Sequence, residues 1–343
     1  MSKTKESLSL VILGMHRSGT SLTASILQEA GVDIGEQLAP ATPTNVKGHF
    51  EDVEFVNFHR KVLISQGLND AGWTSFSQVS VPEQYVSLAK QLIEKRTNKP
   101  LWGWKDPRTV LFLDFWQKLL PNAFYICVYR SPWETIDSLY RRNIQFVDEV
   151  FYKNPNLALQ TWESYNQAIL NFYQQYPEKS VLIPIEYIVS NPQWFIETIA
   201  QKIDYNLNSP KAELLDQSLL KTEVTSSHRP ALLQEFFPSV IELYQKLDKS
   251  SLSNGSLDQE TLSSSFDYKH WVLQDWLDVR RLEFLLNKTE NNLQHQEQSM
   301  LTLQQENQSL KQQISEMKAS KFWKLRNLWF QIKSAILKKF ITN

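Results

Sequence analysis

Short apolar runs alternate with longer amphipathic stretches along the first two thirds of the chain. Runs of four to seven residues bounded by polar or turn-forming residues are typical of buried strands. The stretches between them carry apolar residues at the three- and four-residue spacing of helices that pack on a sheet. This alternation predicts an α/β fold, with a mostly parallel sheet flanked by helices. The expected strands are residues 8–13, 101–104, 123–129 and 181–185.

Helices are expected in the segments between these strands. Gly31 follows the first of them, where a left-handed cap residue belongs, and Pro132 suits the first turn of another. The polar segment 32–50 predicts a long irregular loop, and loops of this length inside a compact domain are usually functional. The expected helices are residues 20–30, 52–65, 108–119 and 157–176, with two more that begin at residues 132 and 192.

Beyond residue 247 the pattern changes to a heptad repeat. Residues 248–275 are a serine-rich linker and connecting segment, and residues 276–318 carry mostly apolar side chains seven apart, which predicts a coiled coil. Asn307 falls in an a position, where a buried asparagine pair favours a parallel homodimer in one register; a long solvated single helix is the alternative. The a positions are Val279, Leu286, Leu293, Met300, Asn307 and Ile314, and the d positions are Leu282, Thr289, Gln296, Leu303, Leu310 and Met317.

The segment 319–343 is basic and aromatic. It carries six Lys and Arg residues and no acidic residue, so its charge is +6 and the rest of the chain sums to −7 within a total of −1. A basic amphipathic helix of this kind is suited to the anionic inner face of a membrane, and packing against a protein surface is the alternative. Its apolar side chains recur at helical spacing at Phe322, Leu325, Trp329, Ile332 and Ile336.

Length and composition bear on the domain count and the compartment. Single domains usually end near about 250 to 300 residues, so the 343-residue chain fits one α/β domain, 1–247, with an appendage. The single cysteine, Cys127, allows no disulfide within the chain and favours a reducing cytosol. The apolar run 8–13 is too short for a signal peptide or a membrane span. We therefore expect a cytoplasmic protein, peripheral at the inner membrane face, and no nucleic-acid partner.

The loop at residues 14–21 combines a glycine turn with a helix start directly after the first strand. It reads Gly-Met-His-Arg-Ser-Gly-Thr-Ser, and the first N–H groups of such a helix, with its dipole, bind anions. Gly14 and Gly19 have the spacing of a nucleoside-triphosphate P-loop, but Thr20 stands where that loop needs lysine. Arg17 is then the loop's only cation, which favours an anion other than a magnesium-bound triphosphate.

This loop resembles the 5′-phosphosulfate loop of the sulfotransferases that use 3′-phosphoadenosine 5′-phosphosulfate (PAPS). The segment Trp-Lys-Asp-Pro-Arg at 104–108 is similar to the family's Lys-Asp-Pro stretch, and Val-Tyr-Arg-Ser-Pro at 128–132 is similar to its 3′-phosphate-binding strand. The three segments occur in the family's order over roughly residues 8–145. The resemblance implies a P-loop-like α/β fold and in-line sulfuryl transfer from PAPS. The six scattered histidines and one cysteine show no metal-ligand spacing, so no metal is expected.

The resemblance also implies which residues bind the donor. Arg17 and the backbone N–H groups that follow it would hold the 5′-phosphosulfate. Arg130, at the end of a strand, and Ser138, on the next helix, would hold the 3′-phosphate. Arg142 is a third candidate there, although an arginine late in a helix is often a solvated charge. The N–H groups of the loop belong to Ser18, Gly19, Thr20 and Ser21.

Four residues are candidates for the chemistry, one of which is Arg17, placed at the phosphosulfate. By resemblance, Lys105 would neutralise the bridging oxygen as the phosphate leaves, and its alternative role is an ion pair with Asp106 or another carboxylate. By resemblance to bacterial and carbohydrate-directed members, Glu51 would be the base that takes the acceptor proton; its alternative is an acidic residue that complements a helix dipole. His49 is the rival base, since an imidazole suits proton transfer near neutral pH. Asp106 and Arg108 are expected to brace a helix, and His59 to be packing or surface.

The tail resembles those of bacterial enzymes that build surface polysaccharides, which implies a glycan or lipid-linked saccharide as acceptor. Three other functions stay open. A nucleotide kinase or NTPase would need the missing lysine. A membrane-associated coiled-coil scaffold without catalysis would keep only the fold. A glycosyltransferase would need a sugar-nucleotide site, which no segment suggests.

Overall fold

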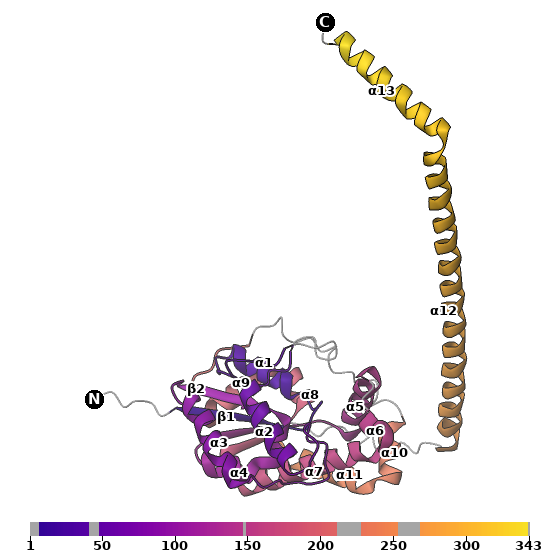
Figure 1. Cartoon of the computed structure of the whole chain (residues 1–343). Helices are drawn as coiled ribbons and strands as arrows, with labels where there is room; N and C mark the ends of the chain where they lie inside the picture. Colours follow the sequence, from indigo (N-terminus) through magenta and orange to yellow (C-terminus); the bar gives the residue numbers. More distant parts are fainter. Residues whose placement is uncertain (1–6, 41–47, 147–148, 211–227, 253–267, 342–343) are drawn as a thin grey trace. The chain divides into compact units, whose positions relative to one another are not determined.

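The computed structural model describes residues 7–40, 48–146, 149–210, 228–252 and 268–341 (Figure 1). The chain divides into two compact units, Met1–Phe266 and Asp267–Asn343. Most of the predicted linker, at 253–267, lies outside the described residues, as does the part of the long loop at 41–47.

The first unit is built on a four-stranded parallel sheet with the order β2-β1-β3-β4. The parallel sheet predicted from the sequence is therefore confirmed. Lys105 belongs to its strand rather than following it, because it pairs with Ile12 of the central strand. The last strand ends one residue early, since Ile185 already begins a helix. The strands are β1 Leu8–Leu13, β2 Leu101–Lys105, β3 Phe124–Tyr129 and β4 Ser180–Pro184.

Helices cover both faces of this sheet (Figure 1). The single helix expected over 108–119 is instead a 3₁₀ helix, η1, followed by α4, because Pro107 lacks an N–H and the Asp106 carboxylate accepts the N–H of Arg108 in a tight capped turn. Helices α3, α6, α8, α10 and α11 are additional to those predicted. The elements are α1 Thr20–Glu29, α2 Val53–Ser65, α3 Glu83–Arg96, η1 Pro107–Phe112, α4 Leu113–Leu119, α5 Pro132–Phe146, α6 Glu149–Lys153, α7 Asn156–Gln175, η2 Pro177–Lys179, α8 Ile185–Ser190, α9 Pro192–Ile203, α10 Arg229–Phe236 and α11 Pro238–Ser250.

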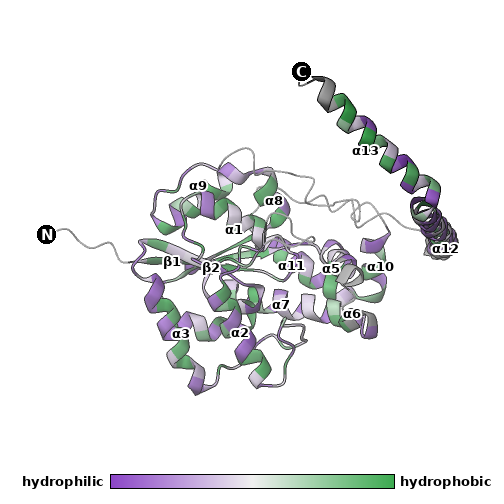
Figure 2. Ribbon diagram, turned by 45° about the horizontal axis from the view of Figure 1, so that its top comes forward, coloured by the Kyte–Doolittle hydropathy of each residue, from purple (hydrophilic) through white to green (hydrophobic). Residues whose placement is uncertain are grey.

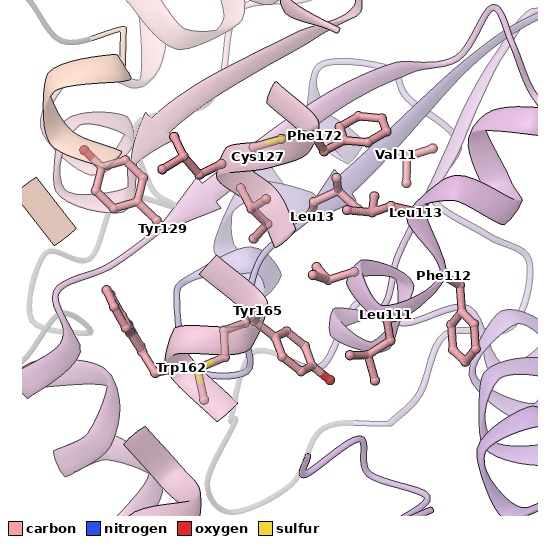
Figure 3. Close-up of a cluster of buried hydrophobic side chains, with 14 of the residues drawn as sticks. Val11, Leu13, Leu111, Phe112, Leu113, Cys127, Tyr129, Trp162, Tyr165 and Phe172 are labelled. Atoms are coloured by element: carbon pink, nitrogen blue, oxygen red, sulfur yellow. The ribbon is translucent and has the colours of Figure 1, made fainter. Parts of the chain in front are cut away.

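The core has one cluster of buried side chains on each face of the sheet, because successive strand residues point to opposite faces. On one face Leu10, Ile12 and Val128 pack against α1, α8 and α9. On the other face Cys127 and Tyr129 pack among the aromatic and aliphatic side chains of α2, α4 and α7, part of which Figure 3 shows. Cys127 is fully buried there, and burial raises the pKa of its thiol, so it is inert packing.

The second unit consists of two helices, α12 Tyr268–Ala319 and α13 Lys321–Ile341. Ser320 separates them, and its hydroxyl accepts the N–H of Trp323 at 3.3 Å, as an N-cap does. Hydrophobic and hydrophilic residues alternate along α13 (Figure 2). Within the described part of the chain no helix is long and apolar enough to cross a membrane. The apolar heptad side chains with described exposure are about half or more exposed: Leu282, Leu286, Leu293, Met300, Leu303, Leu310, Ile314 and Met317.

Candidate active site

The chain's candidate residues gather at the carboxyl edge of the sheet. Strand β1 is followed in the chain by β2 on one side of it and by β3 on the other, so the strand order reverses between β1 and β3. Open α/β sheets bind ligands outside the carboxyl ends of their strands at such a reversal. The loop 14–21 follows β1, Arg130 follows β3, and Lys105 ends β2. Residues far apart in the sequence therefore reach one edge.

The glycines of the loop 14–21 allow it to press against its neighbours. A Cβ on Gly14 would lie 2.7 Å from the backbone oxygen of Val128 in β3. Gly19 has φ +88°, in the region that favours glycine, and a Cβ there would collide with the Ile185 side chain at the start of α8. The backbone of the loop is thus held against both β3 and α8.

The loop also fits a phosphate or sulfate group. Helix α1 begins at Thr20 with no acidic residue in its first turn, so its leading N–H groups and dipole favour an anion. The Ser18 hydroxyl is buried without a hydrogen-bond partner within the part of the chain that the structure describes. A buried hydroxyl of this kind is costly unless a ligand or water satisfies it. Arg17 adds a positive charge next to it.

Arg17 and Ser138, predicted to bind opposite ends of the donor, are in direct contact. The Arg17 Nε donates to the Ser138 Oγ at 2.9 Å across 121 residues of sequence. Ser138 lies on α5 and is 5% exposed. The loop and the first turns of α5 therefore form one continuous surface. The Arg142 side chain, one turn further on, lies outside the described residues, so its role stays a prediction.

Arg130 is buried among acidic side chains at the end of β3. Its Nε donates to the Glu134 Oε2 at 3.0 Å, and the Ser131 hydroxyl donates to the same oxygen at 2.9 Å. The Glu186 Oε1, at the start of α8, lies 3.9 Å from the same Nε. Trp162 fixes the backbone by donating to the Arg130 carbonyl at 3.2 Å. The guanidinium thus has a defined position and two acidic neighbours.

Lys105 and Glu51, both predicted for the chemistry, form an ion pair. The Lys105 Nζ donates to the Glu51 Oε1 at 2.7 Å, with side chains only 2% and 14% exposed. Burial lowers the pKa of Lys105, and the Glu51 carboxylate acts in the opposite direction. The ion pair weighed as an alternative role for Lys105 is thus present, with Glu51 as the partner. The roles of both residues in turnover stay predictions.

The backbone of Glu51 is fixed at the end of the long loop. Its carbonyl accepts the N–H of Ala39 at 2.8 Å, which ties the segment that ends the loop to an earlier part of it. The next residue, Asp52, caps α2 by accepting the N–H of Glu54 at 2.9 Å and pairs with the buried Arg96. Burial raises the pKa of Asp52, with Arg96 opposing it. Glu51 therefore lies directly before the helix cap, and the contacts of Asp52 hold this part of the backbone in place.

His49 meets the loop 14–21 through its backbone. The Ser21 hydroxyl donates to the His49 carbonyl at 3.0 Å. The segment before Glu51 is thus tied to the start of α1, and the Ser21 side chain is engaged in that contact. The role of His49 as a base stays a prediction.

A buried polar network lies next to Lys105. The His59 Nδ1 donates to the Asp106 Oδ2 at 2.7 Å, and the His59 Nε2 accepts from the Trp116 Nε1 at 2.9 Å. Burial lowers the pKa of His59, so the imidazole is neutral and both nitrogens are satisfied. Asp106 also pairs with the Arg108 Nη1 at 2.6 Å. His59 is thus packing rather than surface, and Asp106 and Arg108 brace the turn as expected.

Sequence reasoning missed Glu134 and Glu186. The spacing of Glu134, four residues after Arg130 on a helix, is a recognisable signal for an ion pair. Glu186 comes from a different strand end and carries no local signal. Among the described residues, no group of three or more His, Cys, Asp or Glu side chains is placed to hold a metal ion.

Comparisons with known proteins point to one family. A family profile described as the sulfotransferase family matches residues 9–209. A Caenorhabditis briggsae protein, provisionally described as a protein-tyrosine sulfotransferase, is 24% identical over 282 residues, which cover 78% of this chain and 94% of that relative. The sulfotransferase domain of the curacin biosynthetic pathway is 21% identical, with a TM-score of 0.40 over 75% of this chain and 96% of that domain. The sulfotransferase domain of the Synechococcus PCC 7002 olefin synthase is 17% identical, with a TM-score of 0.44 over 71% and 96%.

Proposed function

The chain belongs to the sulfotransferase family, and from that premise we propose that it transfers the sulfuryl group of PAPS to a hydroxyl group of an acceptor by in-line displacement. One observation carries this proposal. The Arg17 to Ser138 hydrogen bond joins the loop suited to a phosphosulfate to the helix that follows Arg130. One surface therefore offers cations and N–H groups for both charged ends of the donor.

The donor side of the site is assigned to two groups of residues. Arg17, the Ser18 hydroxyl and the N–H groups of 18–21 hold the 5′-phosphosulfate. Arg130 and Ser138 hold the 3′-phosphate, which a guanidinium can bind with two parallel hydrogen bonds. When bound, PAPS supplies a sulfuryl group attached to a good leaving phosphate.

The acceptor side is assigned to Glu51 and Lys105. Glu51 takes the proton of the acceptor hydroxyl as its oxygen bonds to sulfur. Lys105 stabilises the negative charge that develops on the departing phosphate oxygen. The ion pair between them at 2.7 Å holds both side chains at the carboxyl edge of the sheet.

We infer that the acceptor is a glycan or a lipid-linked saccharide, since a membrane-binding tail would bring the enzyme to such substrates. A tyrosine side chain in a protein is the second candidate, because the curated relative is described as acting on protein tyrosine. A screen of both acceptor classes with radiolabelled PAPS distinguishes them. Label in saccharides alone supports the first class, and label in tyrosine peptides alone replaces it with the second.

Arg130→Ala is expected to weaken binding of 3′-phosphoadenosine 5′-phosphate (PAP), the stable product, by roughly 1.5 to 3 kcal/mol. The reason is loss of a charged hydrogen-bond donor to the 3′-phosphate. Calorimetric titration of the wild type and the variant measures this directly. Arg60→Ala is the matched control, because Arg60 is an exposed arginine whose partner, Asp70, lies on the surface. Unchanged PAP affinity in Arg130→Ala would remove that residue from the site.

The same titration tests the function as a whole when ATP with magnesium is compared with PAP. Binding of PAP alone supports the sulfotransferase proposal. Binding of ATP alone would assign the protein to the kinases or NTPases. Binding of neither ligand would favour a scaffold without catalysis.

We further propose that α12 forms a parallel homodimeric coiled coil and that α13 binds an anionic membrane. The heptad side chains of α12 are exposed in a single chain, and a partner helix would bury them. On α13 the Lys333 Nζ lies 5.0 Å from the centre of the Trp329 ring, a pairing suited to a membrane interface.

Three aspartates on the apolar stripe of α13, at Leu325, Trp329 and Ile332, are expected to abolish binding to vesicles of mixed neutral and anionic lipid. The matched control places three aspartates on the opposite face, at Asn327, Gln331 and Ser334, and so adds the same three negative charges. We expect the control to lose only part of the binding, since each charge near the surface is worth about 1 kcal/mol. Vesicle flotation measures the difference, and sedimentation equilibrium should return a dimer for both variants. Equal loss in both would contradict insertion of the apolar stripe.

A further inference from the structure

Two carboxyl groups from different elements face the guanidinium of Arg130. Glu134 is 3% exposed and lies 3.0 Å from the Arg130 Nε, whereas the Glu186 Oε1 lies 3.9 Å from the same atom. That Glu186 oxygen is buried and has no hydrogen-bond partner among the described residues. The two acidic side chains are close enough for their charges to interact. The single positive charge of Arg130 therefore lies next to two carboxyl groups.

A proton on the pair would let one carboxyl group donate to the other and would give the buried Glu186 oxygen a partner, because an ionised carboxylate can only accept. Burial raises the pKa of Glu186 to about 8, and the charge of Glu134 acts in the same direction while Arg130 opposes it. The third ionisable group that faces the pair is Tyr244 of α11, whose pKa is also raised by burial. Tyr244 is thus neutral, so only Glu134 and Glu186 contribute negative charge next to Arg130.

We propose that Glu186 is a positioning residue for Arg130, because a single proton kept by the Glu134 and Glu186 pair leaves the guanidinium able to bind the donor's 3′-phosphate. This inference rests on the proposed function, in which Arg130 holds that phosphate. With the proton in place, the pair carries one negative charge against the one positive charge of Arg130. When the proton is lost, a second negative charge faces the phosphate and repels it.

The proposal predicts that the 3′-phosphate adds a pH dependence to the affinity of a ligand. Loss of one proton with a pKa of about 8 weakens PAP binding by up to about tenfold between pH 7 and pH 9. Adenosine 5′-phosphate differs from PAP only in lacking the 3′-phosphate, so its affinity should not share this dependence. Lys105 also loses its proton at lower pH than an ordinary lysine, but it lies toward the 5′ end and affects both ligands. The ratio of the PAP affinity to the adenosine 5′-phosphate affinity therefore reports the protonation of the Glu134 and Glu186 pair.

The experiment is calorimetric titration of the full chain with PAP and with adenosine 5′-phosphate at pH 7, 8 and 9. In the wild type the affinity ratio should fall by up to about tenfold, and in Glu186→Gln it should stay constant. Glu134→Gln, which also leaves one carboxyl group, should give the same constant ratio if Glu186→Gln does not fold. Glu178→Gln, an exposed acid in η2, should retain the wild-type profile.

The outcomes separate this inference from the proposed function. Tight PAP binding with a constant ratio in the wild type would overturn the shared proton and leave the donor assignment intact. A falling ratio that persists in both variants would also overturn it. Failure of the wild type to bind PAP at any pH would instead overturn the proposed function itself.

Discussion

Glu51→Gln is expected to lower kcat by about 10²- to 10⁴-fold, the usual contribution of a general base. Glutamine keeps the size of the side chain and can accept a hydrogen bond from Lys105, but it cannot take the acceptor proton. PAP affinity should be unchanged, since Glu51 lies on the acceptor side of the site. PAP formation from PAPS, measured with the acceptor that the screen returns, gives kcat, and calorimetric titration gives the affinity.

His49→Gln is the matched comparison, because His49 is the rival base and lies two residues before Glu51. Its carbonyl, which accepts from Ser21 at 3.0 Å, is retained in the variant. We expect a change of less than tenfold. Full turnover in Glu51→Gln together with lost turnover in His49→Gln would transfer the role of base to His49.

Lys105→Met is expected to lower kcat by about 10²- to 10³-fold, as loss of one transition-state donor does. Methionine fills the same buried space without the charge, so the effect reports electrostatics rather than a cavity. The expected sign of the pH dependence follows from burial, which lowers the pKa of Lys105. Wild-type turnover should therefore fall as the pH rises toward the ordinary lysine range. In Lys105→Arg the guanidinium stays charged, and this decline should be absent.

The double variant Lys105→Met, Glu51→Gln tests whether the two residues act as a unit. Because their side chains are in contact, their effects should not add, and the double variant should be little slower than the slower single variant. Fully additive losses would mean that the ion pair has no part in turnover. An activity of Lys105→Met equal to that of the wild type would restrict Lys105 to a structural role.

The fold was predictable where the pattern of the chain is local. All four strands of the sheet are short apolar runs, and their identity needed no knowledge of long-range contacts. The segment 108–119 was mispredicted because apolar periodicity does not reveal that Asp106 caps a tight turn ahead of α4. Helix α3 was missed, since its few buried side chains, Ala89, Leu92 and Arg96, make a weak apolar face.

The positions of the candidate site residues were predictable to the same extent. Arg17 and Arg130 each follow a strand and Lys105 ends one, all in short motifs, so their common edge follows from a parallel sheet. The residues that sequence reasoning missed, such as Glu186, lie in segments that no motif marks. Glu186 and Arg96 act through contacts with residues more than 40 positions away, and such contacts depend on how the helices pack. Sequence reasoning therefore placed the motif residues at one edge of the sheet and missed charged side chains, such as Glu186, that reach them from other elements.

The contact between Gly19 and Ile185 has a consequence for how this enzyme can change over time. Ile185 fills the space where any larger residue at Gly19 would project, and Glu186, the next residue, faces Arg130. A substitution that shifts the start of α8 would therefore alter both ends of the proposed donor site at once. Mutations in the loop 14–21 and at the start of α8 should therefore show strong epistasis. We expect the two segments to change together during evolution.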